Sequence, residues 1–287
     1  MLERIDASML AQTRALFSLS SEELFAQARA CAGRYSQTIT AAPLILTGDC
    51  TTDPPCRHCK WKHLRVIKPR SFTQDRPLDE LIAHMRVLVN HGIARVFIAT
   101  GWLGYRLPRA CIDTIVSLRE ALPTLELFGL FGALDRQSHV DLASAGLDGM
   151  LTSLESPNEA IFKGFRPGGD TLSSRLEALA FAREAGLTIW TGFLMGLGED
   201  EDDVARGIEL IRPFEPQSLS ILPFEPFAHT PMEHHPACDS EALARANAVA
   251  RIALPTTEYF FSDRLDNLGQ EYARQIGING FYETRIE

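Results

Sequence analysis

The sequence predicts an α/β protein, a closed (β/α)8 barrel preceded by a short helical extension. Two observations lead to this fold class. Apolar runs of strand length recur eight times in the 287 residues, and segments with helical periodicity lie between them. This alternation continues to the end of the chain without a proline-rich or low-complexity linker. We therefore expect residues 1–36 to form the helical extension and residues 37–287 to form the barrel as one domain.

The eight predicted strands are rich in Ile, Leu, Val and Phe at both odd and even positions. That composition is typical of strands that are covered on both faces, as they are in a parallel sheet. In chain order the predicted strands are residues 43–47, 95–100, 125–131, 149–154, 188–195, 218–224, 258–261 and 280–284.

The segments between these strands carry apolar residues at helical spacing. Leu78–Asn90 is the clearest, because its apolar side chains fall on one stripe of a helix. Three helical segments end at a glycine, which closes a helix by adopting a left-handed conformation: Gly92, Gly146 and Gly186. Because parallel strands are joined by right-handed crossovers, eight such units fit a closed barrel better than an open sheet.

Composition and charge exclude several classes of protein. The chain is 45% apolar and 23% charged, which is ordinary for a globular protein with a sizeable core. Its net charge of −9 argues against a general binder of nucleic acid or of anionic membranes. No apolar run is long enough to span a bilayer, and residues 1–4 are not followed by the apolar core of a signal peptide. We expect the protein to reside in the cytoplasm.

Three of the six cysteines, Cys50, Cys56 and Cys59, lie within ten residues of one another, just after the first predicted strand. Chemistry in (β/α)8 barrels takes place at the carboxyl ends of the strands, so this loop is placed for it. Three kinds of site fit the spacing C-x5-C-x2-C. They are a zinc site completed by His58 or His63, a disulfide with one free thiol, and a 4Fe-4S cluster with one iron left without a protein ligand. A reducing compartment disfavours the disulfide.

A three-cysteine loop after the first strand of a (β/α)8 barrel resembles the radical S-adenosylmethionine (radical SAM) enzymes. The resemblance implies that Cys50, Cys56 and Cys59 bind a 4Fe-4S cluster whose open iron chelates SAM. It also implies that an electron from the cluster cleaves SAM to methionine and a 5′-deoxyadenosyl radical, which takes hydrogen from a substrate. The common spacing in that family is C-x3-C-x2-C, so this chain has two extra residues in the first gap.

Further segments are similar to the branch that contains biotin synthase and the hydrogenase maturase HydE. In that branch, polar side chains at the end of the fourth strand take the ribose and amino groups of SAM, and Ser153 and Glu155 stand there in this chain. Arg175 matches the arginine that pairs with the SAM carboxylate, and residues 192–199 match a run whose backbone lies against the adenine. The cofactor-binding residues that the resemblance implies are His58, Thr100, Gly101, Trp102, Ser153, Glu155, Arg175, Leu194, Gly196, Leu197 and Glu199.

Two departures from that branch narrow the expected function. Biotin synthase carries a second iron–sulfur cluster as its sulfur source, and the positions that would supply three of its cysteines read Phe97, Phe128 and Trp190 here. Sulfur insertion is therefore not expected, and aromatic side chains that point into the barrel at these positions imply a small substrate. The C-x5-C-x2-C spacing resembles instead the maturase family HmdB, also called HcgA, which is linked to biosynthesis of the iron-guanylylpyridinol (FeGP) cofactor of mononuclear iron hydrogenase.

The leading hypothesis is thus a radical SAM enzyme that acts on a small precursor of the FeGP cofactor. One alternative is another enzyme of the same branch, such as a HydE-like maturase or a methylornithine-synthase-like mutase. An alternative of a different class is a non-catalytic zinc-binding module.

The segment beside the cysteine triplet also predicts an electron donor. Residues 51–76 carry seven basic side chains on a chain that is acidic as a whole. Such a patch favours docking of an acidic ferredoxin or flavodoxin. The seven residues are Arg57, Lys60, Lys62, Arg65, Lys68, Arg70 and Arg76.

Overall fold

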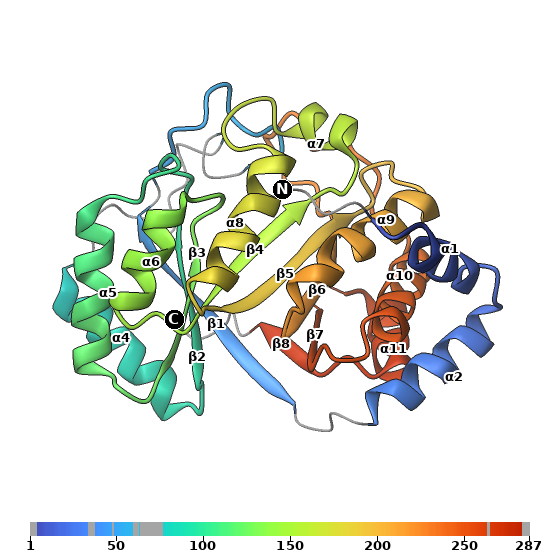
Figure 1. Ribbon diagram of the computed structural model, residues 1–287, viewed down its shortest axis with the longest axis horizontal. Coiled ribbons are helices and arrows are strands. Elements are labelled where there is room, and N and C mark those ends of the chain that lie inside the picture. The colour runs from blue at the N-terminus through green and yellow to red at the C-terminus, as the bar shows by residue number, and fades with distance from the viewer. Residues whose placement is uncertain are drawn as a thin grey trace.

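Eight parallel strands close into a barrel in the order β1-β2-β3-β4-β5-β6-β7-β8, and β8 pairs back onto β1. The computed structural model describes residues 5–33, 38–47, 49–59, 63, 77–262 and 265–282. Helices alternate with the strands and form the outer layer (Figure 1). The (β/α)8 fold predicted from the sequence is confirmed.

All eight predicted strands are present, and only their ends differ. The largest difference is at β1, which begins at Ile39 instead of residue 43, because Ile39, Thr40 and Ala41 pair with β8. The predicted end of the last strand, residue 284, lies outside the described residues. The strands are β1 (Ile39–Thr47), β2 (Arg95–Thr100), β3 (Glu126–Leu130), β4 (Gly149–Glu155), β5 (Thr188–Met195), β6 (Ser218–Pro223), β7 (Tyr259–Ser262) and β8 (Gly280–Tyr282).

The helix predicted at Leu78–Asn90 is α4, with the expected bounds. The three glycines predicted to end helices have positive φ, at +81° for Gly92, +89° for Gly146 and +77° for Gly186. The other helices that follow β2 and the later strands are α5 (Arg109–Ala121), α6 (Arg136–Ser144), α7 (Glu159–Phe165), α8 (Leu172–Glu184), α9 (Glu201–Ile211), the 3-10 turn η2 (Arg212–Phe214), α10 (Ser240–Ala253) and α11 (Asn267–Ile276).

Two helices, α1 (Ala7–Leu16) and α2 (Ser21–Ala32), make up the described part of the N-terminal extension. They pack on the outer surfaces of α9, α10 and α11, as Figure 1 shows. Thr13 of α1 donates a hydrogen bond of 2.6 Å to Glu209 of α9, and the ring of Phe25 in α2 lies 5.5 Å from that of Tyr272 in α11. The extension therefore covers the outside of the barrel on one side.

Aromatic side chains fill the inside of the barrel beneath the carboxyl ends of the strands. Phe97, Phe128, Trp190 and Phe261, here called the aromatic layer, belong to a core cluster separate from the main one, and each is at most 2% exposed. Ring centroids in the layer lie 4.5 Å apart for Phe128 and Trp190 and 4.8 Å apart for Trp190 and Phe261. The expectation that Phe97, Phe128 and Trp190 point inward is confirmed.

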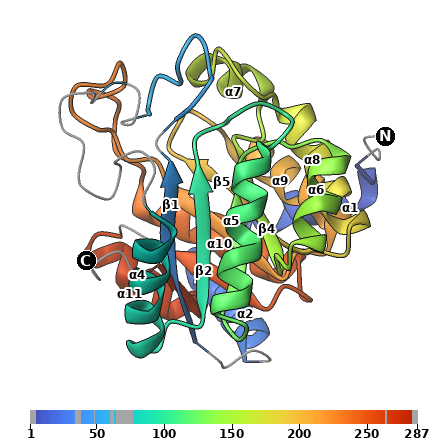
Figure 2. The same ribbon diagram turned by 90° about the vertical axis from the view of Figure 1, so that its left-hand side faces the viewer.

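The carboxyl ends of the strands meet at one end of the molecule. Figure 2 shows the arrowheads of β1 and β2 at this end, with α7 lying above them. The loops at this end carry the cysteine triplet, and the aromatic layer closes the barrel beneath them. None of the helices in the described ranges has both the length and the apolar composition that a membrane crossing requires.

Candidate functional site

A cavity of about 290 Å³ opens at the carboxyl ends of β1 to β4 and contains most of the predicted site. All three cysteines of the triplet line it. So do seven of the predicted cofactor-binding residues: His58, Thr100, Gly101, Trp102, Ser153, Glu155 and Arg175. The barrel thus brings together residues that lie more than 100 positions apart in the sequence.

None of the three cysteines forms a disulfide within the described residues, and Cys56 is the most deeply placed at 5% exposure. The Sγ of Cys50 donates to Thr52 Oγ1 at 3.2 Å. Burial raises the pKa of the Cys56 thiol to about 11, although the nearby Arg166 guanidinium opposes that shift. Among the described side chains, no three of His, Cys, Asp or Glu converge as ligands of a single metal ion.

The loop after β2 holds the cysteine loop from one side. The amide and hydroxyl of Thr51 both donate to the carbonyl of Trp102, at 2.8 and 3.0 Å. A Cβ on Gly101 would lie 2.2 Å from the carbonyl oxygen of Asp49 and 2.5 Å from Cys50 Cβ. Only glycine permits this approach of the two loops, which gives the predicted Gly101 a structural role of its own.

The segment after α7 holds the cysteine loop from the other side. The amide of Arg57 donates to the carbonyl of Phe165 at 2.8 Å, and the ring of His58 lies 5.1 Å from that of Phe165. A Cβ on Gly168 would lie 2.5 Å from the carbonyl oxygen of Asp53. The triplet is therefore fixed between two loops that belong to different parts of the barrel.

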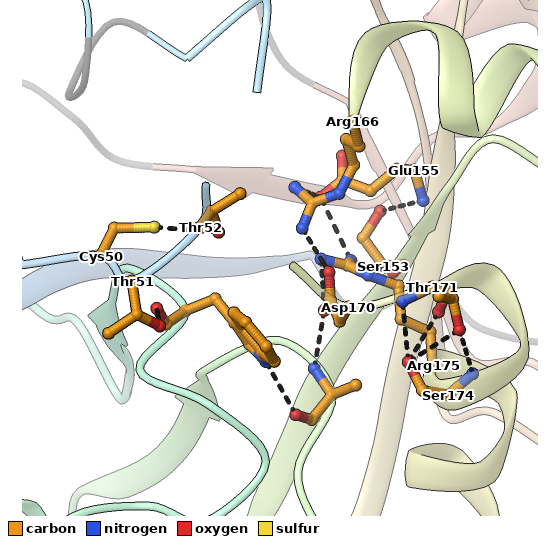
Figure 3. A network of polar contacts seen from close by, with 12 residues as sticks. Cys50, Thr51, Thr52, Ser153, Glu155, Arg166, Asp170, Thr171, Ser174 and Arg175 are labelled. Carbon is orange, nitrogen blue, oxygen red and sulfur yellow. Dashed lines mark hydrogen bonds and ion pairs between the residues drawn. The ribbon is translucent and has the colours of Figure 1, made fainter. Parts of the chain in front are cut away.

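Four charged side chains, Glu155, Arg166, Asp170 and Arg175, form a buried group beside the triplet, here called the mouth network (Figure 3). Arg175 reaches Glu155 Oε1 at 3.1 Å and Asp170 Oδ2 at 3.0 Å, and also donates to the carbonyl of Ser153. Arg166 contacts the same two carboxylates. Asp170 also accepts from the amide of Ala133 at 3.0 Å. Each cation thus contacts both anions.

The mouth network keeps both of its carboxylates ionised. Burial alone would raise the pKa of Glu155, but the guanidinium groups of Arg175 and Arg166 hold it below its ordinary value. Burial likewise opposes ionisation of Asp170, and the same two arginines lower its pKa. Two cations and two anions leave the group neutral as a whole.

Both arginines retain an unused donor. The Nε atoms of Arg166 and Arg175 are buried without a hydrogen-bond partner in the described part of the chain. An unpaired buried donor costs roughly 1–3 kcal/mol, and more when the group is charged. Arg166 and Arg175 are 9% and 4% exposed and line the same cavity as the three thiols. Three cysteine sulfurs and two arginine N–H groups without an acceptor suit a 4Fe-4S cluster with an anionic ligand beside it.

A break in the pairing of β4 with β5 sets the backbone conformation of Ser153 and Glu155. The register with β5 shifts between these two residues, and Glu155 has φ of +60°, which is rare for a residue with a side chain. The Glu155 amide donates to Ser153 Oγ at 2.9 Å, and its carboxylate is held by the two arginines. The break directs the Glu155 side chain toward the cavity, where the resemblance places a ligand of the cofactor.

His58 is a neutral imidazole against the cavity wall. Burial lowers its pKa to about 4, and its Nδ1 has no partner among the described groups. The Nε2 of His63 lies 2.9 Å from the carbonyl oxygen of Cys56, so this ring contacts the backbone of the triplet.

Four predicted residues, Leu194, Gly196, Leu197 and Glu199, do not line this cavity. They lie at the end of β5 and in the turn that follows it. The Glu199 carboxylate accepts from the amides of Gly196 and Leu197, so it holds this turn in shape. A Cβ on Gly196 would lie 2.8 Å from Cys238 Cβ, so the chain itself requires that glycine.

Sequence reasoning missed Arg166 and Asp170. Both come from the segment 166–170, which links α7 to α8 and reads as an ordinary turn because of Pro167, Gly168 and Gly169. One signal was present: two opposite charges four residues apart flank a Pro-Gly-Gly run in the connection between the fourth and fifth strands.

The predicted basic patch is described only in part. Arg57 is exposed, and its guanidinium donates to the carbonyl of Gly164 at 3.4 Å. The remaining six basic residues of the patch, Lys60, Lys62, Arg65, Lys68, Arg70 and Arg76, lie outside the described residues.

Comparison with known sequences agrees with this site. The sequence profile described as "Radical SAM superfamily" matches residues 44–211, which include the triplet and the mouth network. A biotin synthase of Pseudomonas savastanoi pv. phaseolicola is 30% identical over 295 residues, covering 96% of this chain and 80% of the relative. The uncharacterized protein MJ0785 of Methanocaldococcus jannaschii is 28% identical over 215 residues, covering 73% of this chain but only 56% of its own length.

Solved structures show the same fold. Methylornithine synthase (PylB) superposes with a TM-score of 0.81 at 19% identity, covering 95% of this chain and 81% of that one. The FeFe-hydrogenase maturase HydG from Carboxydothermus hydrogenoformans superposes with a TM-score of 0.81 at 18% identity, covering 95% of this chain and 66% of that one.

Proposed function

This chain belongs to the radical SAM superfamily, in the branch that contains biotin synthase. From that premise we propose a mechanism and a substrate for it. The family implies a 4Fe-4S cluster and SAM as cofactors. When bound, such a cluster supplies one electron to the C5′–S bond of SAM, which gives methionine and a 5′-deoxyadenosyl radical. That radical would take a hydrogen atom from the substrate, and the products of that step would be 5′-deoxyadenosine and a substrate radical.

One observation carries the proposal: three thiols and two arginines with unpaired Nε–H groups line a single cavity. Cys50, Cys56 and Cys59 would hold three irons of the cluster. Arg175 would pair with the carboxylate of SAM, because charge-assisted hydrogen bonds from a buried guanidinium are strong.

The remaining SAM contacts come from the ends of four strands. Ser153 and Glu155 would take the ribose and amino groups, and the backbone at Thr100, Gly101 and Trp102 the methionine amino group. Leu194, Gly196 and Leu197 would contact the adenine through their backbone, in a turn that Glu199 holds in shape. His58 would present a neutral ring to the adenine.

For the substrate, we propose a small precursor of the FeGP cofactor, as in the HmdB (HcgA) family. The C-x5-C-x2-C spacing supports this assignment. The aromatic layer supports a small substrate, because it closes the barrel beneath the cavity and fills three positions where biotin synthase would carry cysteines of a second cluster.

The chemistry is tested by anaerobic reconstitution with iron and sulfide. We expect about four irons per chain and 5′-deoxyadenosine that forms only with dithionite and SAM. Cys56→Ala should lose both, whereas Cys31→Ala, which changes a half-buried cysteine of α2, should retain both. A chain that binds one zinc ion and leaves SAM intact would instead be a zinc-binding module.

The substrate is tested by isotope transfer. Deuterated pyridinol precursors should deliver deuterium into 5′-deoxyadenosine, one atom per SAM cleaved. Transfer from a precursor of methylornithine, and not from a pyridinol, would assign the chain to the mutase alternative within the branch.

The electron donor is proposed to be an acidic ferredoxin or flavodoxin that docks near the exposed Arg57. Its rate of cluster reduction should fall as ionic strength rises, because salt screens charges at a docking surface. A rate independent of salt would exclude this surface.

A further inference from the structure

Arg166 is a buried cation that the resemblance to known families does not assign. It caps α7 at its carboxyl end, where its amide donates to the carbonyl of Phe162 at 2.8 Å. Its guanidinium lies 5.5 Å from the centroid of the Phe162 ring, and the residue is 9% exposed. Arg166 and Cys56 line the same cavity.

The backbone fixes the place of Arg166 relative to the triplet. Residues next to Arg166 and Cys56 are joined directly, because the Arg57 amide donates to the carbonyl of Phe165 at 2.8 Å. On the other side of Arg166, Gly168 packs on the carbonyls of Asp53 and Pro54 without room for a Cβ. A movement of Arg166 away from Cys56 would therefore require both loops to change.

Stability does not explain this cation. Removing a charge from water costs free energy that its ion pairs only partly return, so buried pairs contribute little net stability. Arg166 also keeps its Nε unpaired while it contacts Glu155 and Asp170. A group arranged in this way is better suited to act on negative charge that arrives in the cavity.

We propose that Arg166 raises the reduction potential of the cluster bound by Cys50, Cys56 and Cys59, by fixing a positive charge beside Cys56. Reduction adds one negative charge to the cluster. A cation held nearby and shielded from water stabilises that added charge, so the reduction potential of the cluster rises. Arg166 thus affects the cluster through its charge and takes no direct part in the reaction.

Asp170 opposes this effect. Its carboxylate contacts Arg166 and Arg175, and at 2% exposure it is more deeply buried than either of them. Its negative charge disfavours the reduced cluster. Changes at Arg166 and Asp170 should therefore shift the potential in opposite directions, whereas a general loosening of the site would shift it in one direction.

The test is a redox titration of the reconstituted cluster, followed by electron paramagnetic resonance without SAM or substrate. Arg166→Gln removes the charge and should lower the reduction equilibrium constant by about tenfold, which is ~59 mV for one electron. Arg166→Lys retains the charge and should stay close to the parent protein. Asp170→Asn should shift the potential upward. Arg206→Gln, an equal change of charge on the exposed surface of α9, should shift nothing.

Three results would overturn the proposal. The first is an unchanged potential in Arg166→Gln at full iron content, and the second is an equal shift in Arg166→Gln and Arg166→Lys. The third is a downward or absent shift in Asp170→Asn, which decides the matter if Arg166→Gln fails to hold iron. The inference rests on the cluster proposed above but not on the substrate. If the parent protein takes up no cluster, the proposed function fails instead.

Discussion

The mouth network and the aromatic layer lie in the same barrel and are both largely hidden from water, yet one is built from charged side chains and the other from aromatic rings. Asp170 and Arg175 are 2% and 4% exposed, and Phe97 and Trp190 are 2% and 1% exposed. In the layer, the centroids of contacting rings lie 4.5–5.6 Å apart, which adds about 0.5–1.5 kcal/mol per pair to the free energy of burial. In the network, attraction between charges must first offset their loss of hydration.

This difference separates stability from function. The four side chains of the aromatic layer have one polar atom, the Trp190 Nε1, and it already donates to Gln217 Oε1 at 3.0 Å. The mouth network leaves two buried N–H groups unpaired and faces a cavity. We therefore expect changes in the layer to lower the free energy of unfolding and changes at the mouth to alter cofactor binding.

The largest effect on stability is expected from Trp190→Ala. The change deletes the largest fully buried side chain among the described residues and leaves the Gln217 oxygen without its donor. The free energy of unfolding of the cluster-free chain should fall by about 3–5 kcal/mol, measured by urea denaturation. Dithionite-dependent cleavage of SAM should remain within a few-fold of the parent rate at a temperature where the variant is folded.

The matched control is Leu268→Ala, because Leu268 is 52% exposed and its loss should cost under about 0.5 kcal/mol. If Trp190→Ala instead abolished SAM cleavage while stability stayed unchanged, the layer would be part of the active site and the comparison would fail.

An effect of intermediate size, on iron binding, is expected from Gly168→Ala, because Gly168 packs directly on the backbone of the cysteine loop. The new Cβ would lie 2.5 Å from the Asp53 carbonyl and 2.6 Å from that of Pro54, so the cysteine loop must move. Overpacking of this kind costs about 1–3 kcal/mol. Iron bound per chain after reconstitution should fall well below that of the parent.

Gly164→Ala is its control, because a Cβ at Gly164, four residues earlier, meets no atom within 4 Å. This variant should bind iron as the parent does. Equal iron content in the two variants would show that the contact between the loops is not needed to shape the triplet.

The smallest effect is the dependence of stability on pH through Glu155. Folding lowers the pKa of this carboxylate, so its contribution is complete above the unfolded pKa of about 4.3 and is lost as pH falls through the folded value. That contribution is ~1.4 kcal/mol for each unit by which folding lowers the pKa. Unfolding by urea between pH 7 and pH 3 should therefore show a steeper loss for the parent than for Glu155→Gln.

Glu159→Gln, which changes an exposed carboxylate of α7, should follow the parent profile. A Glu155→Gln profile as steep as that of the parent would mean that the carboxylate is not held ionised by the two arginines.

The fold was predictable because each strand and helix carries its own signal. Apolar runs marked the eight strands, and Gly92, Gly146 and Gly186 marked helix ends. The start of β1 was missed because Thr40, Ala41 and Ala42 are small or polar, and they become a strand only by pairing with β8 and β2. Such pairing connects residues from opposite ends of the chain, which no local pattern reveals.

The site was predictable where motifs carry it and not where distant contacts do. Cys50, Cys56 and Cys59 stand out in the sequence because they lie within ten residues of one another. Arg166 and Asp170 belong to no comparable motif. The sequence around an arginine in a turn does not reveal whether the folded chain brings carboxylates to it. The place of Arg166 and Asp170 beside the triplet depends on the meeting of two loops that lie about a hundred residues apart in the sequence.

The contacts that hold the cysteine loop between the loops after β2 and α7 affect how the chain binds iron. Because the loops after β2 and α7 already restrain residues 50–59, their conformational entropy is lost when the barrel folds, and metal insertion loses little more. A zinc finger differs, since there the metal itself drives the folding of the peptide. Iron binding by this protein should therefore depend on the glycines and carbonyls that hold the cysteine loop as well as on the three cysteines.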